Sequence, residues 1–174
     1  MASRPSFHVG RSQWHLAWDR TVPPIATVAP GSIVEFDALD ASNGQVTAAS
    51  ATADLLTLAF DQVDQVAGPI YVESAEPGDT LEVELLSFEP GSWGWTANIP
   101  GFGLLADEFP DPYLRITRLD GVAGEFLPGI RIPLAPFCGE LGVAPAGEPQ
   151  NGASGIRIPG RNSPATPSRR VILR

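Results

Sequence analysis

The chain has 174 residues and a formal net charge of −9, with 20 Asp or Glu against 11 Lys or Arg. This length suits one ordinary domain or two small ones. An acidic chain lacks the basic footprint that binding a phosphate backbone requires, which argues against a nucleic-acid partner. Because the longest apolar run is far shorter than about 18 residues, we also expect no membrane span.

Glycine and proline each occur 18 times, which is well above average usage. Since apolar residues alternate along several segments, this excess indicates many turns between short strands, as in an all-β sandwich or barrel. Cys138 is the only cysteine, so no intramolecular disulfide can form and a reducing compartment is expected. The N-terminus shows no basic segment followed by an apolar one, which makes the cytoplasm the default location.

The first predicted strand covers residues 14–18, where alternation places Trp14, Leu16 and Trp18 on one face. His15 lies between them. It is either a half-exposed strand histidine or a metal ligand or acid–base group, and a lone histidine does not decide between the two.

A polar cluster follows the next predicted strand, residues 33–36. Asp40, Asn43 and Gln45 offer carboxylate and amide oxygens around Asn43-Gly44, a pair that favours a tight turn. These oxygens suit a hard cation or a small polar substrate, and they equally suit an Asx-type turn at a strand end. Their spacing does not fit the twelve-residue calcium loop.

Residues 52–60 predict one short helix, about two turns long. Residues 68–86 predict a strand, a turn and a second strand. The turn at 76–79 contains Pro followed by Gly, which favours type II. In residues 80–86, leucine and valine alternate with glutamate, so we expect one dry face and one acidic face.

Two tryptophans and a phenylalanine, Trp93, Trp95 and Phe102, lie among glycines with few charges between them. They form either a pocket wall that binds a substrate or an irregular loop that plugs the sandwich. Residues 113–119 predict a regular strand, followed by an Asp-Gly turn. Cys138 precedes a glycine, but only His8 and His15 are available as a base, so a buried cysteine is favoured over a nucleophile.

Six motifs occur in order along the chain. They are His15-x-x-Trp18-Asp19, Leu39-Asp40-Ala41 with Asn43-Gly44-Gln45, Gly68-Pro69-Ile70-Tyr71-Val72-Glu73, Glu76-Pro77-Gly78-Asp79, Pro100-Gly101-Phe102-Gly103 and the run from Pro136 to Pro145. Together they resemble the N-terminal part of the acetamidase/formamidase family, over roughly residues 14–148. The resemblance implies hydrolysis of small linear amides to a carboxylate and ammonia. It also implies a mainly β fold, a jelly-roll-like sandwich with irregular Gly/Pro-rich loops.

The resemblance implies a bound divalent metal, zinc or calcium, and places the Asp40 cluster at the site. We expect Asp40 and Glu140 to be catalytic, and Asp40 and His15 to be metal ligands. The residues expected to bind substrate are Asn43, Gln45, Trp93, Trp95 and Phe102. We expect a small amide as the substrate and a homo-oligomer as the assembly. The alternative is a non-catalytic β-sandwich that binds a ligand, or a structural fragment.

Two segments are expected: a family-like β domain over residues 1–148 and a basic Pro/Ser/Arg tail over residues 149–174. Residues 157–174 carry five Arg and no acid. Family members are about twice this length, and their later Gly-Gly-Asn-x-Asp and Gly-Asp-x-His-x-x-Gln-Gly-Asp-Gly-Glu motifs do not occur here. The tail is typical of a shifted reading frame in GC-rich DNA or of disorder, the rival being a genuine basic segment that binds an acidic partner. We expect the truncated chain to be impaired in catalysis.

Overall fold

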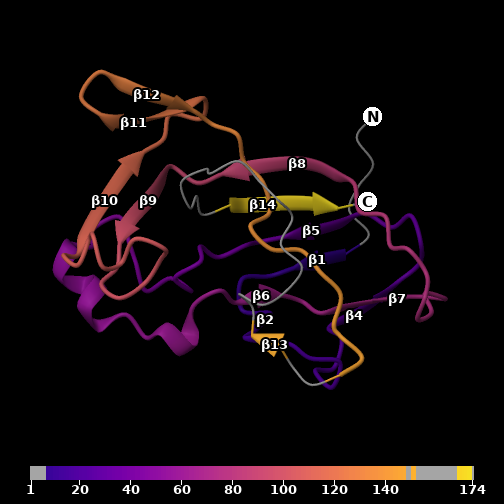
Figure 1. Cartoon of the computed structure of the whole chain (residues 1–174). Helices are drawn as coiled ribbons and strands as arrows, with labels where there is room; N and C mark the ends of the chain where they lie inside the picture. Colours follow the sequence, from indigo (N-terminus) through magenta and orange to yellow (C-terminus); the bar gives the residue numbers. More distant parts are fainter. Residues whose placement is uncertain (1–6, 148–149, 152–167, 174) are drawn as a thin grey trace.

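The computed structural model describes residues 7–147, 150–151 and 168–173. Within these ranges the fold is mainly β, as the sequence predicts (Figure 1). Short strands alternate with irregular Gly- and Pro-containing connections. None of the helices in the described ranges has the length and apolar character needed to cross a membrane.

Fourteen strands occur in the described ranges. They are β1 Phe7–Val9, β2 Trp14–His15, β3 Ala17–Trp18, β4 Ala26–Val28, β5 Val34–Phe36, β6 Val66–Ala67, β7 Ile70–Val72, β8 Leu85–Pro90, β9 Trp93–Asn98, β10 Tyr113–Arg118, β11 Ala123–Leu127, β12 Ile130–Pro133, β13 Gln150–Asn151 and β14 Ser168–Leu173. The predicted short helix is a 3-10 helix, η1 Thr52–Thr57, and a second one, η2 Phe60–Gln62, follows it.

The largest sheet has four strands in the order β1-β5-β14-β8 and lies at the centre of Figure 1. β1 and β5 are parallel, and His8 lies opposite Glu35. Because side chains alternate along a strand, Val9 and Val34 point to the other face, where both are buried. This sheet therefore has an apolar inner face and, on β1 and β5, an ionisable outer one.

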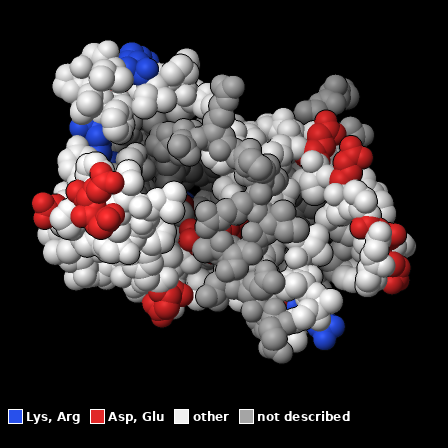
Figure 2. All heavy atoms as spheres, viewed as in Figure 1, with Lys and Arg blue, Asp and Glu red and all other residues white. Residues whose placement is uncertain are grey.

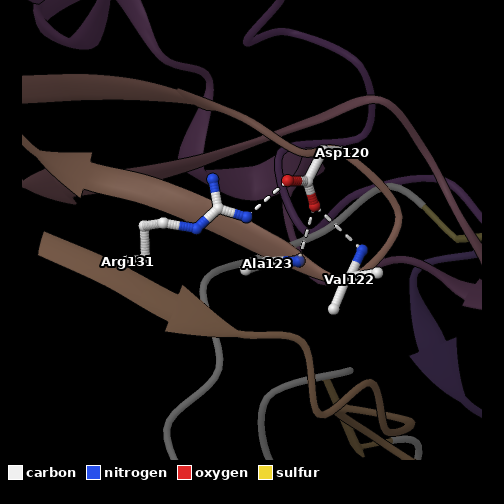
Figure 3. Close-up of polar contacts among 4 residues, drawn as sticks. All are labelled: Asp120, Val122, Ala123 and Arg131. Atoms are coloured by element: carbon white, nitrogen blue, oxygen red, sulfur yellow. Dashed lines mark hydrogen bonds and ion pairs between the residues drawn. The ribbon is translucent and has the colours of Figure 1, made fainter.

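Two antiparallel ladders stand beside this sheet, β9 with β10 and β11 with β12. The predicted strand at residues 113–119 is confirmed as β10. At the turn into β11, the Asp120 carboxylate accepts hydrogen bonds from the N–H groups of Val122 and Ala123 and contacts the Arg131 guanidinium (Figure 3). These contacts hold the pKa of Asp120 well below its usual range, with the Arg131 hydrogen bond as the largest cause.

The two ladders pack closely at Gly124. A Cβ atom there would lie 2.8 Å from side-chain atoms of both Leu119 and Thr117. Real Cβ atoms do not approach other atoms that closely, so this site accepts glycine alone without movement of its neighbours.

Of the strand, turn and strand predicted over residues 68–86, the first strand is confirmed as β7 and the turn forms, but the second strand is wrong. The Asp79 N–H donates to the Glu76 carbonyl, and Gly78 has the positive φ that a type II turn requires. However, β7 pairs in parallel with β4, and residues 80–84 are not in a strand. Leu81 is 49% exposed, so the expected dry face is absent. The ladder partner of β7 comes from an earlier part of the chain, and local alternation does not reveal that partner.

The core of the described part is small. Its buried apolar side chains are Val9, Trp18, Val34, Val46, Leu55, Leu119 and Ala123. By contrast, five large apolar side chains of η2 and of the connection between β9 and β10 are exposed: Phe60, Phe102, Leu104, Leu105 and Phe109. Figure 2 shows acidic side chains in several separate groups on one face of the molecule, with few basic ones.

The predicted tail, residues 149–174, is described only in part. Its described residues are assigned to strands, because β13 pairs with β3 and β14 lies between β5 and β8. The rest of the tail lies outside the described residues. The proposed domain boundary and the shifted reading frame therefore stay predictions.

Candidate functional site

The polar cluster at Asp40 is a tight turn built on a buried carboxylate. Asp40 Oδ2 accepts from the Ser42 N–H at 3.2 Å and the Ser42 hydroxyl at 2.6 Å, and Oδ1 accepts from the Gly44 N–H at 3.0 Å. Asn43 adopts a positive φ of 56°, which asparagine tolerates better than most residues. The Asx-type turn proposed from the sequence therefore forms.

A tryptophan from a distant strand completes this cluster. The Trp95 Nε1–H donates to Asp40 Oδ2 at 2.7 Å, joining β9 to the turn. Asp40 is 6% exposed and Ser42 is 1% exposed, so water does not replace these bonds readily. Hydrogen bonds to a charged acceptor are the strong ones. The carboxylate thus fixes the turn and the indole in one arrangement.

Two glutamines extend the cluster. Gln45 exchanges hydrogen bonds with the backbone of Ala59, donating to the carbonyl at 3.1 Å and accepting from the N–H at 2.8 Å. Gln65 Nε2 donates to the Asp40 carbonyl at 2.8 Å. The Gln65 Oε1 atom is buried and has no hydrogen-bond partner among the described residues. A buried acceptor without a partner is unusual in proteins.

The other expected site residues have separate surroundings. Trp93 lies two residues before Trp95 on β9, so both indoles belong to one face of the strand. Phe102 is exposed, and its ring centroid lies 5.3 Å from that of Phe60. Glu140 is half-buried in the segment after β12. The structure thus brings Asp40 and Trp95 into direct contact, whereas Phe102 packs on a different residue.

His15 has one ring nitrogen occupied. Its Nδ1 lies 2.6 Å from the Ala17 carbonyl. Because a carbonyl can only accept, Nδ1 is the donor in this contact, and Nε2 is the nitrogen that a neutral ring offers to a metal. Histidines that bind metals usually donate their second ring nitrogen in this way. The ring therefore suits the expected role of ligand.

The carboxylate of Asp40 is less open as a ligand. Each oxygen of a carboxylate has about two acceptor sites. Oδ2 of Asp40 already accepts three hydrogen bonds and Oδ1 accepts one, so only Oδ1 has a site left for a metal. Among the described residues, the group of ionisable side chains close enough to hold a metal ion is instead His8, Glu35 and Asp37.

Cys138 is half-buried, and its burial raises the pKa of the thiol. A raised pKa lowers the thiolate fraction, which is the nucleophilic form. The preference for a buried cysteine over a nucleophile thus agrees with its surroundings.

A hollow of about 350 Å³ opens beside the ladder of β9 and β10. It is lined by Asn98, Glu108, Phe109, Pro110, Asp111 and Tyr113. None of the expected site residues lines it.

The sequence does not predict two of these features: the contact of Gln65 with Asp40, and the group formed by His8, Glu35 and Asp37. Gln65 reads as part of a polar connection, and no local pattern links it to Asp40. His8 and Glu35 lie on strands that alternate apolar and ionisable residues, and this alternation predicts their outward face. Their contact depends on the parallel pairing of β1 with β5, which local sequence does not show.

The sequence of this chain is similar to those of known proteins. A sequence profile of the Acetamidase/Formamidase family matches residues 4–152. The chain is 31% identical over 147 residues to an acetamidase of Mycolicibacterium smegmatis, covering 76% of this chain and 36% of the relative. It is 32% identical over 144 residues to a formamidase of Methylophilus methylotrophus, covering 78% and 35%.

A solved structure gives the same result for the fold. The crystal structure of an acetamidase from Bacillus halodurans superposes with a TM-score of 0.77 at 32% sequence identity, over 83% of this chain and 48% of that one. The chain therefore spans about a third of the length of these curated relatives and about half of that solved chain.

Proposed function

Because the chain belongs to the Acetamidase/Formamidase family, we propose that it takes part in the hydrolysis of small linear amides, such as formamide or acetamide, to a carboxylate and ammonia. The relatives are named acetamidase and formamidase. The observation that carries the proposal is the buried Asp40 turn and its bond to Trp95, which both fall inside the matched residues.

Amide hydrolysis needs an activated water, donors that stabilise the oxyanion, and a proton for the leaving nitrogen. In our proposal Asp40 Oδ1 faces the reaction, because Oδ2 already accepts three hydrogen bonds. Oδ1 is then the Asp40 atom left to bind the divalent metal proposed below, beside the substrate amide. The hydrogen bonds on the other oxygen hold the carboxylate in one orientation.

We assign proton transfer to Glu140, the second carboxylate expected at the site. Asn43 and Trp93 are the proposed substrate contacts, together with Trp95, since aromatic walls with a few polar groups suit a small amide. Gln45 has a different part in this scheme, because its amide is bonded to the Ala59 backbone. It supports the turn that presents Asp40.

The proposal includes a divalent metal, zinc or calcium, held by His15 Nε2 and Asp40 Oδ1. When bound, such an ion would supply a water of lowered pKa. A catalytic zinc usually has three protein ligands, so two are too few. We therefore expect this chain alone to release ammonia slowly.

A chimera tests the function. Residues 4–152 of this chain would replace the aligned segment of the Bacillus halodurans acetamidase, and ammonia release from formamide and acetamide would be measured. We expect turnover in the chimera and a fall of about 100-fold or more in the Asp40→Asn version, since lost electrostatic contacts cost this much. A folded chimera without turnover on either amide contradicts the proposal. Rapid turnover by the isolated chain would contradict the expected impairment.

We further propose a homo-oligomer and a cytoplasmic location. The exposed apolar side chains between β9 and β10, which include Phe102, Leu104 and Leu105, support association, because large exposed apolar patches mark interaction sites. Sedimentation of the wild-type chain and of Leu104→Glu tests the oligomer, and unchanged monomeric behaviour of both would contradict it. The single thiol at Cys138 supports the location, and fractionation of the source cells checks it.

A further inference from the structure

A second group of ionisable side chains lies on the outer face of β1 and β5. The parallel register puts His8 directly opposite Glu35. Asp37 follows two residues after Glu35 and therefore shares its face. The Asp37 N–H donates to the Val9 carbonyl at 2.9 Å, so the pairing of the two segments continues one step past β5 and fixes the Asp37 backbone. Three side chains thus converge on one small area.

The ligand atoms of this group are close enough for one ion. One atom from each of His8, Glu35 and Asp37 lies within 4.8 Å of the others, and His8 Nε2 is 3.1 Å from Asp37 Oδ2. In a tetrahedral zinc site with bonds near 2.1 Å, ligand atoms are about 3.4 Å apart. The side chains of His8 and Asp37 are 51% and 34% exposed, so they have room to rotate and an ion can reach them.

The donor set selects a class of metal. Calcium and magnesium favour sites made of oxygen ligands. An imidazole with two carboxylates suits zinc and its first-row neighbours instead. We propose that His8, Glu35 and Asp37 form a binding site for a divalent transition-metal ion such as zinc, with water in the remaining positions. The bound ion joins β1 to β5 and secures the first strand to the central sheet.

This site is independent of the proposed amide chemistry, since it shares no residue with the Asp40 and His15 pair. The rival explanation for the cluster is a simple ion pair between His8 and Asp37 that binds no metal. A measurement of zinc affinity distinguishes the metal site from the simple ion pair, because an ion pair alone would not bind zinc in preference to other cations.

Calorimetric titration of the full, metal-stripped chain with zinc provides the first test. We expect His8→Gln and Asp37→Asn each to lower the affinity of one zinc equivalent by about tenfold or more. Glu82→Gln removes an exposed acid elsewhere and should leave that affinity unchanged. Calcium and magnesium should bind far more weakly than zinc. Equal binding of all three ions, or zinc binding that His8→Gln leaves unaltered, overturns the proposal.

The nuclear magnetic resonance signals of the histidine rings provide a second test, which uses the wild-type chain and therefore does not depend on whether a variant folds. The chain has two histidines, so both rings can be followed separately. We expect zinc at one equivalent to shift the His8 ring signals. A shift of the His15 ring alone overturns the proposal and instead supports a metal at Asp40 and His15. Failure of the chimera's amidase activity leaves this result untouched, so the two proposals fail separately.

Discussion

Replacing Asp40 with alanine is the most direct test of how the candidate site is built. The substitution leaves four donors without their acceptor: the N–H and hydroxyl of Ser42, the Gly44 N–H and the Trp95 indole N–H. Each hydrogen bond to a charged group contributes about 1.5–3 kcal/mol. Since some donors will find water in the space left, the sum overestimates the effect. We expect the free energy of unfolding to fall by about 3–5 kcal/mol, because several buried donors lose their acceptor.

The assay is urea denaturation followed by circular dichroism at pH 7, with the exposed acid Asp107 replaced by alanine as a control. The free energy of unfolding of this control should stay within about 0.5 kcal/mol of the wild-type value. Trp95→Phe removes one donor while keeping an aromatic ring, and should lower the free energy of unfolding by about 1–2 kcal/mol. In a double-mutant cycle, Asp40→Ala and Trp95→Phe should show a coupling of about 1 kcal/mol, because the two side chains are in contact.

The reasoning fails if Asp40→Ala is as stable as the Asp107→Ala control. In that case the carboxylate would contribute nothing to folding, and its burial would have to be explained by catalysis alone. A coupling energy near zero would refute the Trp95 contact specifically, while leaving the local turn intact.

Three further outcomes are expected. Gly124→Ala should lower the free energy of unfolding by about 1–3 kcal/mol through overpacking, whereas Gly139→Ala, with open space around its Cβ position, should not. Cys138 should react slowly with a thiol reagent at pH 7.5 and rapidly after unfolding in urea, because burial raises its pKa. The pKa of Asp120 is lowered by Arg131, so its stabilising contribution is present above about pH 3.9 and is lost as the pH falls further. Thermal melts should therefore show Asp120→Asn less stable than wild type at pH 7, with the difference shrinking below pH 3.9, and a constant difference would contradict this.

Local chemistry made part of this fold predictable. The turn at Asp40 could be read from an aspartate, an asparagine and a glycine in sequence, and the turn at residues 76–79 from its Pro-Gly pair. The strand at 113–118 followed from alternation and a following Asp-Gly. In each case the residues that determine the structure are neighbours along the chain.

Pairing between distant segments was not predictable in the same way. The sequence predicts Asp40 and Trp95 as site residues. It does not predict that the Trp95 indole donates to the Asp40 carboxylate, because the two residues are 55 positions apart in the chain. Likewise, the sequence places a second strand after the turn that follows β7, whereas the ladder partner of β7 is β4, from an earlier part of the chain. A strand's own residues specify which face is buried, whereas the choice of neighbour depends on the packing of the whole sheet.

The order of the central sheet has a consequence for how the protein is made. β5 has β1 on one side and β14 on the other, and β14 also pairs with β8. During synthesis, β1 and β5 emerge early, but β14 leaves the ribosome more than a hundred residues later. Until then β5 and β8 each present a bare edge, and bare edges pair readily with other nascent chains. Synthesis rate and chaperone supply should therefore govern the yield of folded protein.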